Sequence, residues 1–190
     1  MVLLLSQFCS APLPHHYAVA RCILHYLKGT KSFHLHFGGV RREEVLSGMT
    51  DADWVGDRSR WVSISGFIWS YGGGPISWSM KKQNCMALSS TKVEHVALTH
   101  AVQEGIWLRN SLQQIQVPVP SPLVISTNNN RALSLASNDS SHRCAKHIDI
   151  CYHFICSHIE NGDFNIVHTL GITVRDKTIQ MFVKVGLFLE

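Results

Sequence analysis

The sequence predicts an α/β protein in which a mixed sheet of five strands is flanked by helices. Three strand-like segments follow one another between residues 46 and 80, as in an antiparallel meander. From residue 88 onward, helical and strand-like segments alternate instead, as in parallel β–α–β units. With 190 residues, 45% of them hydrophobic, the chain is long enough to bury a core but too short for two ordinary domains.

A helix and a strand are expected before this sheet. Pro14 and Gly29 bracket apolar residues at helical spacing, which predicts a helix over about 15–28. Apolar and polar residues alternate from Phe33 to Phe37, which predicts a half-exposed strand.

The charged residues 41–44 are typical of a linker. We therefore expect an N-terminal appendage over residues 1–44 and a main domain over residues 45–190.

The main domain begins with three strands, and Gly72-Gly73-Gly74 between the last two favours a hairpin. A long helix follows, because small and apolar residues recur at helical steps until Pro118 and Pro120 end the segment. The predicted elements are strands over about 46–52, 64–71, 75–80 and 123–127, a last strand from Phe164, and helices near 88–115, 130–137, 146–161 and 173–185.

Charge, the N-terminal residues and cysteine content argue against a secreted, membrane-spanning or disulfide-stabilised protein, but they do not identify a function. The formal charge of +4 and the pI of about 8.8 allow an anionic partner but do not require one. The apolar run at the N-terminus is too short for a signal peptide or a membrane span. Six cysteines lack the spacing of a disulfide framework. We expect an intracellular protein, cytoplasmic or nuclear, with no membrane association and no small-molecule cofactor.

Two acidic positions are compatible with metal chemistry. Asp51 and Asp53 are two apart in a predicted strand, so their carboxylates share a face, and paired carboxylates suit Mg²⁺. By itself such a pair is more often a solvated acidic turn. Glu94 lies in the first turns of the long helix, where a carboxylate also complements the helix dipole.

Four runs of the sequence resemble successive blocks of the ribonuclease H domain in copia-type LTR retrotransposon Pol polyproteins. They are TDADWVGD, SGFIWSYGGGPISWSMKKQ, MALSSTKVEHVALTHAVQEGIWLRNSL and AKHIDICYHFICSHIENGDF. Upstream, LSQFCSAPLPHHYAVARCILHYLKGTK resembles the end of the reverse transcriptase that precedes this domain. The resemblance covers nearly the whole chain in the order of the family.

This resemblance implies a ribonuclease H fold with a five-stranded mixed sheet. It also implies an endonuclease reaction, the hydrolysis of RNA in an RNA–DNA hybrid, in which four acidic residues hold two Mg²⁺ ions. Clustered acids are needed because two cations about 3.5–4 Å apart repel each other.

The resemblance also assigns the catalytic positions. The first acid falls on Asp51 and the second on Glu94. The third falls on Asn128, where the family has aspartate, and the fourth on Asp176, whose surroundings are slightly offset from the family pattern. The implied metal ligands are Asp51, Glu94 and Asp176. We expect Asn128 to impair catalysis severely, because a neutral amide does not offset cationic charge as a carboxylate does.

Positive positions of the family blocks match Lys81, Lys82, Lys146 and His147. The resemblance implies that these residues bind the phosphates of the RNA–DNA hybrid without reading its sequence. Ordinary solvated positions explain them equally well.

Two alternatives remain open. One is a catalytically dead remnant that still binds nucleic acid, which the amide at Asn128 favours. The other is a zinc-binding module, because His147, Cys151 and His158 share one stripe of a predicted helix. Zinc is the less favoured alternative, since the sequence has no Cys-x-x-Cys knuckle.

Overall fold

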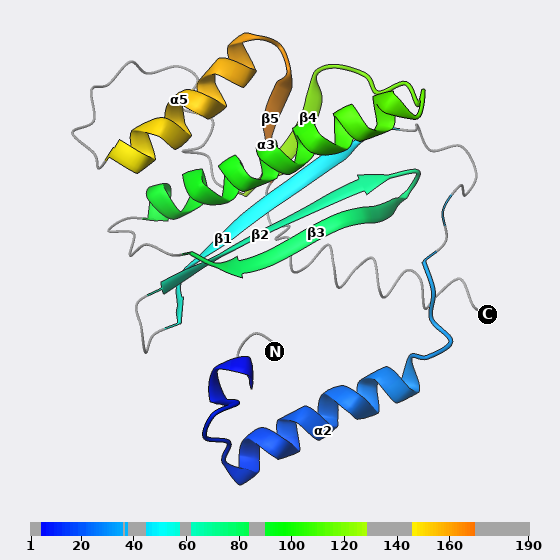
Figure 1. Cartoon of the computed structure of the whole chain (residues 1–190), viewed down its shortest axis with the longest axis vertical. Helices are drawn as coiled ribbons and strands as arrows, with labels where there is room; N and C mark the ends of the chain where they lie inside the picture. The colour runs from blue at the N-terminus through cyan, green and yellow to red at the C-terminus, as the bar shows by residue number, and fades with distance from the viewer. Residues whose placement is uncertain are drawn as a thin grey trace. The chain divides into compact units, whose positions relative to one another are not determined.

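The computed structural model describes residues 5–35, 37, 45–57, 62–83, 90–128 and 146–169 (Figure 1). The chain divides into two compact units, one holding the described residues up to Leu35 and the other holding those from Phe37 onward. Within these ranges, no helix combines the length and the apolarity needed to cross a lipid bilayer.

The first unit is built on the helix α2 (Pro14–Gly29), which confirms the first predicted helix. Pro14 opens the helix, where its missing N–H is not needed. The N–H of Leu13 donates to Nδ1 of His16 at 3.0 Å, and the N–H of His16 donates to the Leu13 carbonyl at 2.9 Å. These reciprocal bonds satisfy groups that a helix start leaves without partners. The 3-10 helix η1 (Ser6–Phe8) precedes α2.

The strand expected from Phe33 to Phe37 is not formed in the described part of that segment. Residues 33–35 and 37 lie in no helix or strand. The N–H of Phe33 instead donates back to the Thr30 carbonyl at 2.9 Å, as in a turn. Alternation of apolar residues does not by itself make a strand, because ladder hydrogen bonds need a neighbouring strand.

The second unit contains a five-stranded sheet of order β3-β2-β1-β4-β5. The first three strands pair antiparallel, whereas β4 pairs parallel with both β1 and β5. The sheet is therefore mixed, as the sequence predicted. The strands are β1 (Ser47–Asp57), β2 (Val62–Tyr71), β3 (Gly74–Lys82), β4 (Leu123–Thr127) and β5 (Phe164–His168).

Glycine is needed at the turn between β2 and β3. Gly72 and Gly73 have φ values of 59° and 85°. Side chains with a Cβ rarely adopt this left-handed region. The predicted hairpin is thus confirmed together with its cause.

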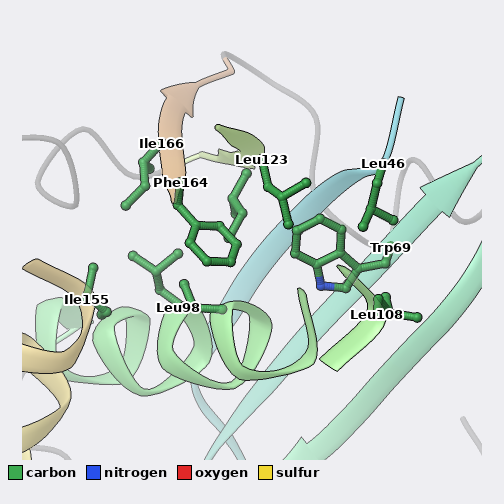
Figure 2. Packing of buried hydrophobic residues seen from close by; sticks show 10 residues of the cluster. Leu46, Trp69, Leu98, Leu108, Leu123, Ile155, Phe164 and Ile166 are labelled. Carbon is green, nitrogen blue, oxygen red and sulfur yellow. The ribbon is translucent and has the colours of Figure 1, made fainter. Parts of the chain in front are cut away.

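Two helices, α3 (Ser90–Gln114) and α5 (Lys146–Glu160), pack over the sheet (Figure 1). Helices and strands enclose the hydrophobic core that Figure 2 shows. In this core Trp69 is fully buried, and its indole N–H donates to the Ala101 carbonyl at 3.0 Å. The ring of Phe164 meets the indole edge-on, with 6.4 Å between centroids. Trp69 therefore ties β2 to both α3 and β5.

Two glycines make room for this indole. A Cβ at Gly105 would lie 2.4 Å from Cζ2 of Trp69, and a Cβ at Gly48 would lie 2.8 Å from the same atom. Both distances are far below ordinary contact, so α3 and β1 approach the indole only because glycine stands there. This close packing fixes how α3 crosses the sheet, and with it the location of the residues that α3 carries.

The other predicted strands and the two long helices are also confirmed, with ends that differ by a few residues. The linker at 41–44 and the helices expected near 130–137 and 173–185 fall outside the described residues.

Candidate functional site

Parallel pairing brings two of the predicted site residues to one edge of the sheet. β1 and β4 run in parallel with Thr50 opposite Thr127. Asp51 and Asn128 are the next residues along each chain segment, at the point where β4 ends. In α/β sheets this carboxyl edge of parallel strands is the usual place for binding groups.

The two side chains are joined directly. Nδ2 of Asn128 donates a hydrogen bond to Oδ1 of Asp51 at 3.0 Å. The same oxygen accepts the main-chain N–H of Ala52 at 2.9 Å. Because an ionised carboxylate only accepts, the amide must turn its NH₂ group toward it. A carboxylate in place of the Asn128 amide would need a cation or a proton shared with Asp51. The amide instead offers Asp51 an N–H dipole and needs neither.

His168 supports this pair from the neighbouring strand. It is the last residue of β5, and its Nε2 lies 3.1 Å from the main-chain oxygen of Asn128. The N–H of Thr169 donates to the Thr127 carbonyl at 2.9 Å, which extends the ladder beside it. No motif marks His168 in the sequence, and only the register of β4 and β5, which pairs His168 with Thr127, brings it beside Asn128.

Helix α3 carries Glu94 to the same end of the sheet. Nε2 of Gln83, directly after β3, donates to Oγ of Ser65 at 2.6 Å and to the Val93 carbonyl at 2.9 Å. Ser65 lies opposite the residue that follows Asp51 in the register of β1 and β2. The first turns of α3 are thereby anchored at this end of the sheet, and the Oε2 atom of Glu94 is buried.

The described residues do not fit the two Mg²⁺ ions that the resemblance implies. Within the described ranges, no three His, Cys, Asp or Glu side chains are grouped so as to hold a metal ion. Asp176 lies outside these ranges. Asn128 presents its N–H rather than its oxygen to Asp51, so a cation shared by the two side chains would meet a donor instead of a ligand.

The sheet places the two predicted phosphate contacts Lys81 and Lys82 on opposite faces, because successive residues of a strand alternate. Lys81 lines a groove beside α3. Gly48 contacts Trp69 on that same face, so the alternation along β1 turns Asp51 to the other one. Lys82 therefore shares the face of Asp51, and Lys81 does not.

Three further predicted site residues have side chains that the structure does not describe. Lys146 and His147 open α5, and Asp53 lies in β1, but only their main chain is described. Asp53 is two residues after Asp51 in the same strand, as the predicted shared face requires.

An ion network occupies the turn between α5 and β5. Asp163 accepts from Nη1 of Arg109 at 2.8 Å and lies 2.8 Å from Nδ1 of His158. The hydrogen bond with His158, followed by that with Arg109, lowers the pKa of the Asp163 carboxyl. His158 is thus engaged with a carboxylate, and the described side chains form no metal-binding group of three. The zinc alternative gains no support from this arrangement.

Solved structures define the class of protein. The chain matches the structure of LC11-RNase H1, isolated from compost, with a TM-score of 0.50 and 11% sequence identity. The match covers 78% of this chain and 100% of that chain. The protein therefore has a ribonuclease H fold.

Relatives in sequence define the family. The chain is 34% identical over 180 residues to the Retrovirus-related Pol polyprotein from transposon TNT 1-94 of Nicotiana tabacum, which covers 95% of this chain. It is also 42% identical over 104 residues to Secreted RxLR effector protein 161 of Plasmopara viticola, covering 55% of this chain and 72% of that protein. No family model matches. The chain belongs to the copia-type Pol polyproteins, and it spans 13% of the length of the tobacco relative.

Proposed function

We propose that this chain is a ribonuclease H-like domain that binds RNA–DNA hybrids and whose hydrolytic activity is severely impaired by Asn128. The observation that carries the proposal is the hydrogen bond from Asn128 Nδ2 to Asp51 Oδ1 at 3.0 Å. Fold and family supply the expected reaction, hydrolysis of the RNA strand. The geometry at the carboxyl edge of β1 and β4 supplies the reason for its impairment.

The electrostatics of this edge explain the impairment. Two N–H donors already occupy Oδ1 of Asp51. A cation that approached it would have to displace the amide donor and would gain a neutral oxygen in return, which offsets its charge poorly. Each 1.4 kcal/mol of lost transition-state stabilisation slows a reaction about tenfold. A loss of a few kcal/mol therefore reduces turnover by several powers of ten.

Binding of nucleic acid makes weaker demands than hydrolysis. The chain has a formal charge of +4, and Lys82 stands on the face of the sheet that holds Asp51. A phosphate contact by this lysine requires only a positive charge, and it does not depend on the Asp51 pair.

The proposed substrate also bears on localisation. If the chain acts on an RNA–DNA hybrid, its proposed site of action is inside the cell, in the cytoplasm or the nucleus.

Cleavage of a labelled RNA–DNA hybrid tests the proposal. The wild-type chain and Asn128→Asp are compared in Mg²⁺ and in Mn²⁺, and the substitution is expected to raise the rate by about a thousandfold or more. Asn128→Asp combined with Asp51→Asn is the control, and it must be inactive if cleavage arises at this edge. Wild-type cleavage as fast as that of Asn128→Asp would contradict the proposal.

A second candidate function is nucleic-acid binding without any hydrolysis. It is favoured by the same hydrogen bond, because the amide satisfies Asp51 without a metal ion. Under this alternative the wild-type chain and Asn128→Asp both bind the hybrid in EDTA, and neither cleaves it in Mg²⁺. That outcome would show that the loss of hydrolysis has a further cause at residues other than Asn128.

A further inference from the structure

Strand β3 forms one edge of the sheet, and the middle of this edge carries exposed apolar side chains. Among the described strands, β3 pairs only with β2. Trp78 and Met80 of β3 are 66% and 58% exposed. An edge strand is a template for pairing with another chain, and proteins usually protect such edges with charged residues or proline. The stretch around Trp78 and Met80 is therefore a candidate interaction surface.

The main-chain groups of Trp78 and Met80 point to the open side of β3. The N–H of Gln83 donates to the Ser63 carbonyl of β2 at 2.9 Å. In an antiparallel ladder the hydrogen-bonding groups of successive residues alternate in direction, and the register is regular over residues 77–82. Every second residue before Gln83 therefore bonds to β2. The residues between them, Trp78 and Met80, turn their N–H and C=O groups outward.

The side chains of β3 that face α3 carry opposite polarity at the two ends of the strand. Oγ of Ser77 donates to the carboxylate of Glu104 on α3 at 2.6 Å. Lys81 lines the same groove beside α3 but lies four residues further along β3, about 13 Å away at about 3.3 Å per residue. Lys81 is thus too far along the strand to pair with Glu104 of its own chain.

An antiparallel copy of β3 brings these two ends together. With Ser79 opposite Ser79 of the second copy, Lys81 of each chain lies opposite Ser77 of the other chain. It then lies next to the Glu104 carboxylate that Ser77 binds. In a two-fold interface each contact occurs twice, because residue i meets residue j and j meets i. The edge is therefore complementary in charge to an inverted copy of itself.

The same register matches the apolar side chains on the other face. Trp78 of each chain lies opposite Met80 of its copy, and contacts between an indole and a thioether are favourable. These two residues also carry the outward main-chain groups, so they form hydrogen-bonded ladder pairs. Lys82 lies opposite Ile76 of the copy, so no lysine faces another lysine. Charge, apolar contacts and main-chain hydrogen bonds are thus complementary in one register.

We propose that two copies of this chain dimerise through β3, antiparallel about a two-fold axis at Ser79, and form one continuous sheet. Helix α3 leaves room for the second copy, because it packs against β1 and β2. The pair of Asp51 and Asn128 lies at β1 and β4, and β2 separates it from the interface. Dimerisation therefore leaves this pair accessible in both copies and does not depend on hydrolysis.

Sedimentation equilibrium of the full chain over the micromolar range tests the proposal. A reducing agent is included because the thiols of Cys9 and Cys22 are exposed. The wild-type chain is expected to show a reversible equilibrium of monomer and dimer. Lys81→Glu and Glu104→Lys each place like charges at both symmetric contacts, and each should raise the dissociation constant about tenfold or more. An equimolar mixture of the two variants should restore the dimer, because both contacts of the mixed dimer again join opposite charges.

Two further variants separate this edge from general effects of charge and folding. Lys82→Glu makes the same change of charge one residue away, on the other face, and should dimerise much as the wild type does. Met80→Pro removes an N–H that points away from β2, so it should abolish pairing while the sheet is retained. Thermal unfolding checks that each variant is folded.

Three outcomes would overturn the proposal. One is a wild-type chain that stays monomeric throughout, in which case Pro75, Lys81 and Lys82 protect the edge from pairing. Another is a dimer that neither Lys81→Glu nor Glu104→Lys weakens, which would place the contact on another surface. The third is a mixture of these two folded variants that fails to restore the dimer, because the predicted symmetric contact would then not exist.

Discussion

Asp163 and Asp51 are two half-buried carboxylates of the same unit, and they are satisfied in different ways. Asp163 is held by the Arg109 guanidinium and by His158, each at 2.8 Å. Oδ1 of Asp51 is held by the N–H dipoles of Ala52 and Asn128. One carboxylate is matched with a guanidinium and an imidazole, whereas the described bonds at the other come from main-chain and side-chain amide donors.

This difference suggests different roles for the two residues: Asp163 stabilises the fold, whereas Asp51 belongs to the candidate site. A guanidinium offsets the full charge of a carboxylate, so the Asp163 network joins α3, α5 and β5 without help from solution. Amide donors offset a carboxylate only in part. Both donors point at Oδ1 of Asp51, and they make this edge a poor place to hold a cation.

The largest expected effect comes from replacing the amide with a second carboxylate. Asn128→Asp places two carboxylates about 3 Å apart and should lower the free energy of unfolding in EDTA by about 2 kcal/mol. Mg²⁺ should restore it, because a ligand that binds only the folded state stabilises that state. Thermal unfolding with and without Mg²⁺ measures both effects. The wild-type chain is the control, and an equal response of both proteins to Mg²⁺ would contradict the expectation.

A smaller effect is expected from Asp163→Asn, about 1 kcal/mol at neutral pH once solvent screening is allowed for. The pKa of Asp163 is lowered from 3.8, so its contribution is fully present above that value and is lost as the pH falls through the lowered pKa. Denaturant unfolding at several pH values should therefore show the difference from wild type vanishing in acid. Asp51→Asn is the matched comparison and should cost less, because an amide oxygen can still accept both N–H groups.

The smallest effect is expected at His168. His168→Phe removes the bond to the Asn128 carbonyl and should cost about 0.5–1 kcal/mol. His168→Gln keeps a donor and serves as the control. The side-chain amide signal of Asn128 in NMR spectra reports the pair directly, and it should move in the phenylalanine variant more than in the glutamine variant. An unchanged signal in both would show that His168 does not position Asn128.

The sequence by itself determined the elements of the sheet, because strand alternation, helical periodicity and glycine turns are local properties of the chain. The assignment of Asp51, Glu94 and Asn128 to a site came from the family resemblance and stays a prediction. The same local logic failed from Phe33 to Phe37, where alternating residues form no strand in the described segment. Strand formation depends on a partner that local sequence does not specify.

Only the tertiary structure decided how these residues meet. The parallel register of β1 and β4 put an amide donor rather than an oxygen against Asp51, and it brought His168 to the same edge. The pairing of β2 and β3 separated Lys81 from Lys82, although the two are adjacent in the sequence. The physical reason is that a strand turns neighbouring residues to opposite faces, while the register of the sheet determines which distant residues share a face.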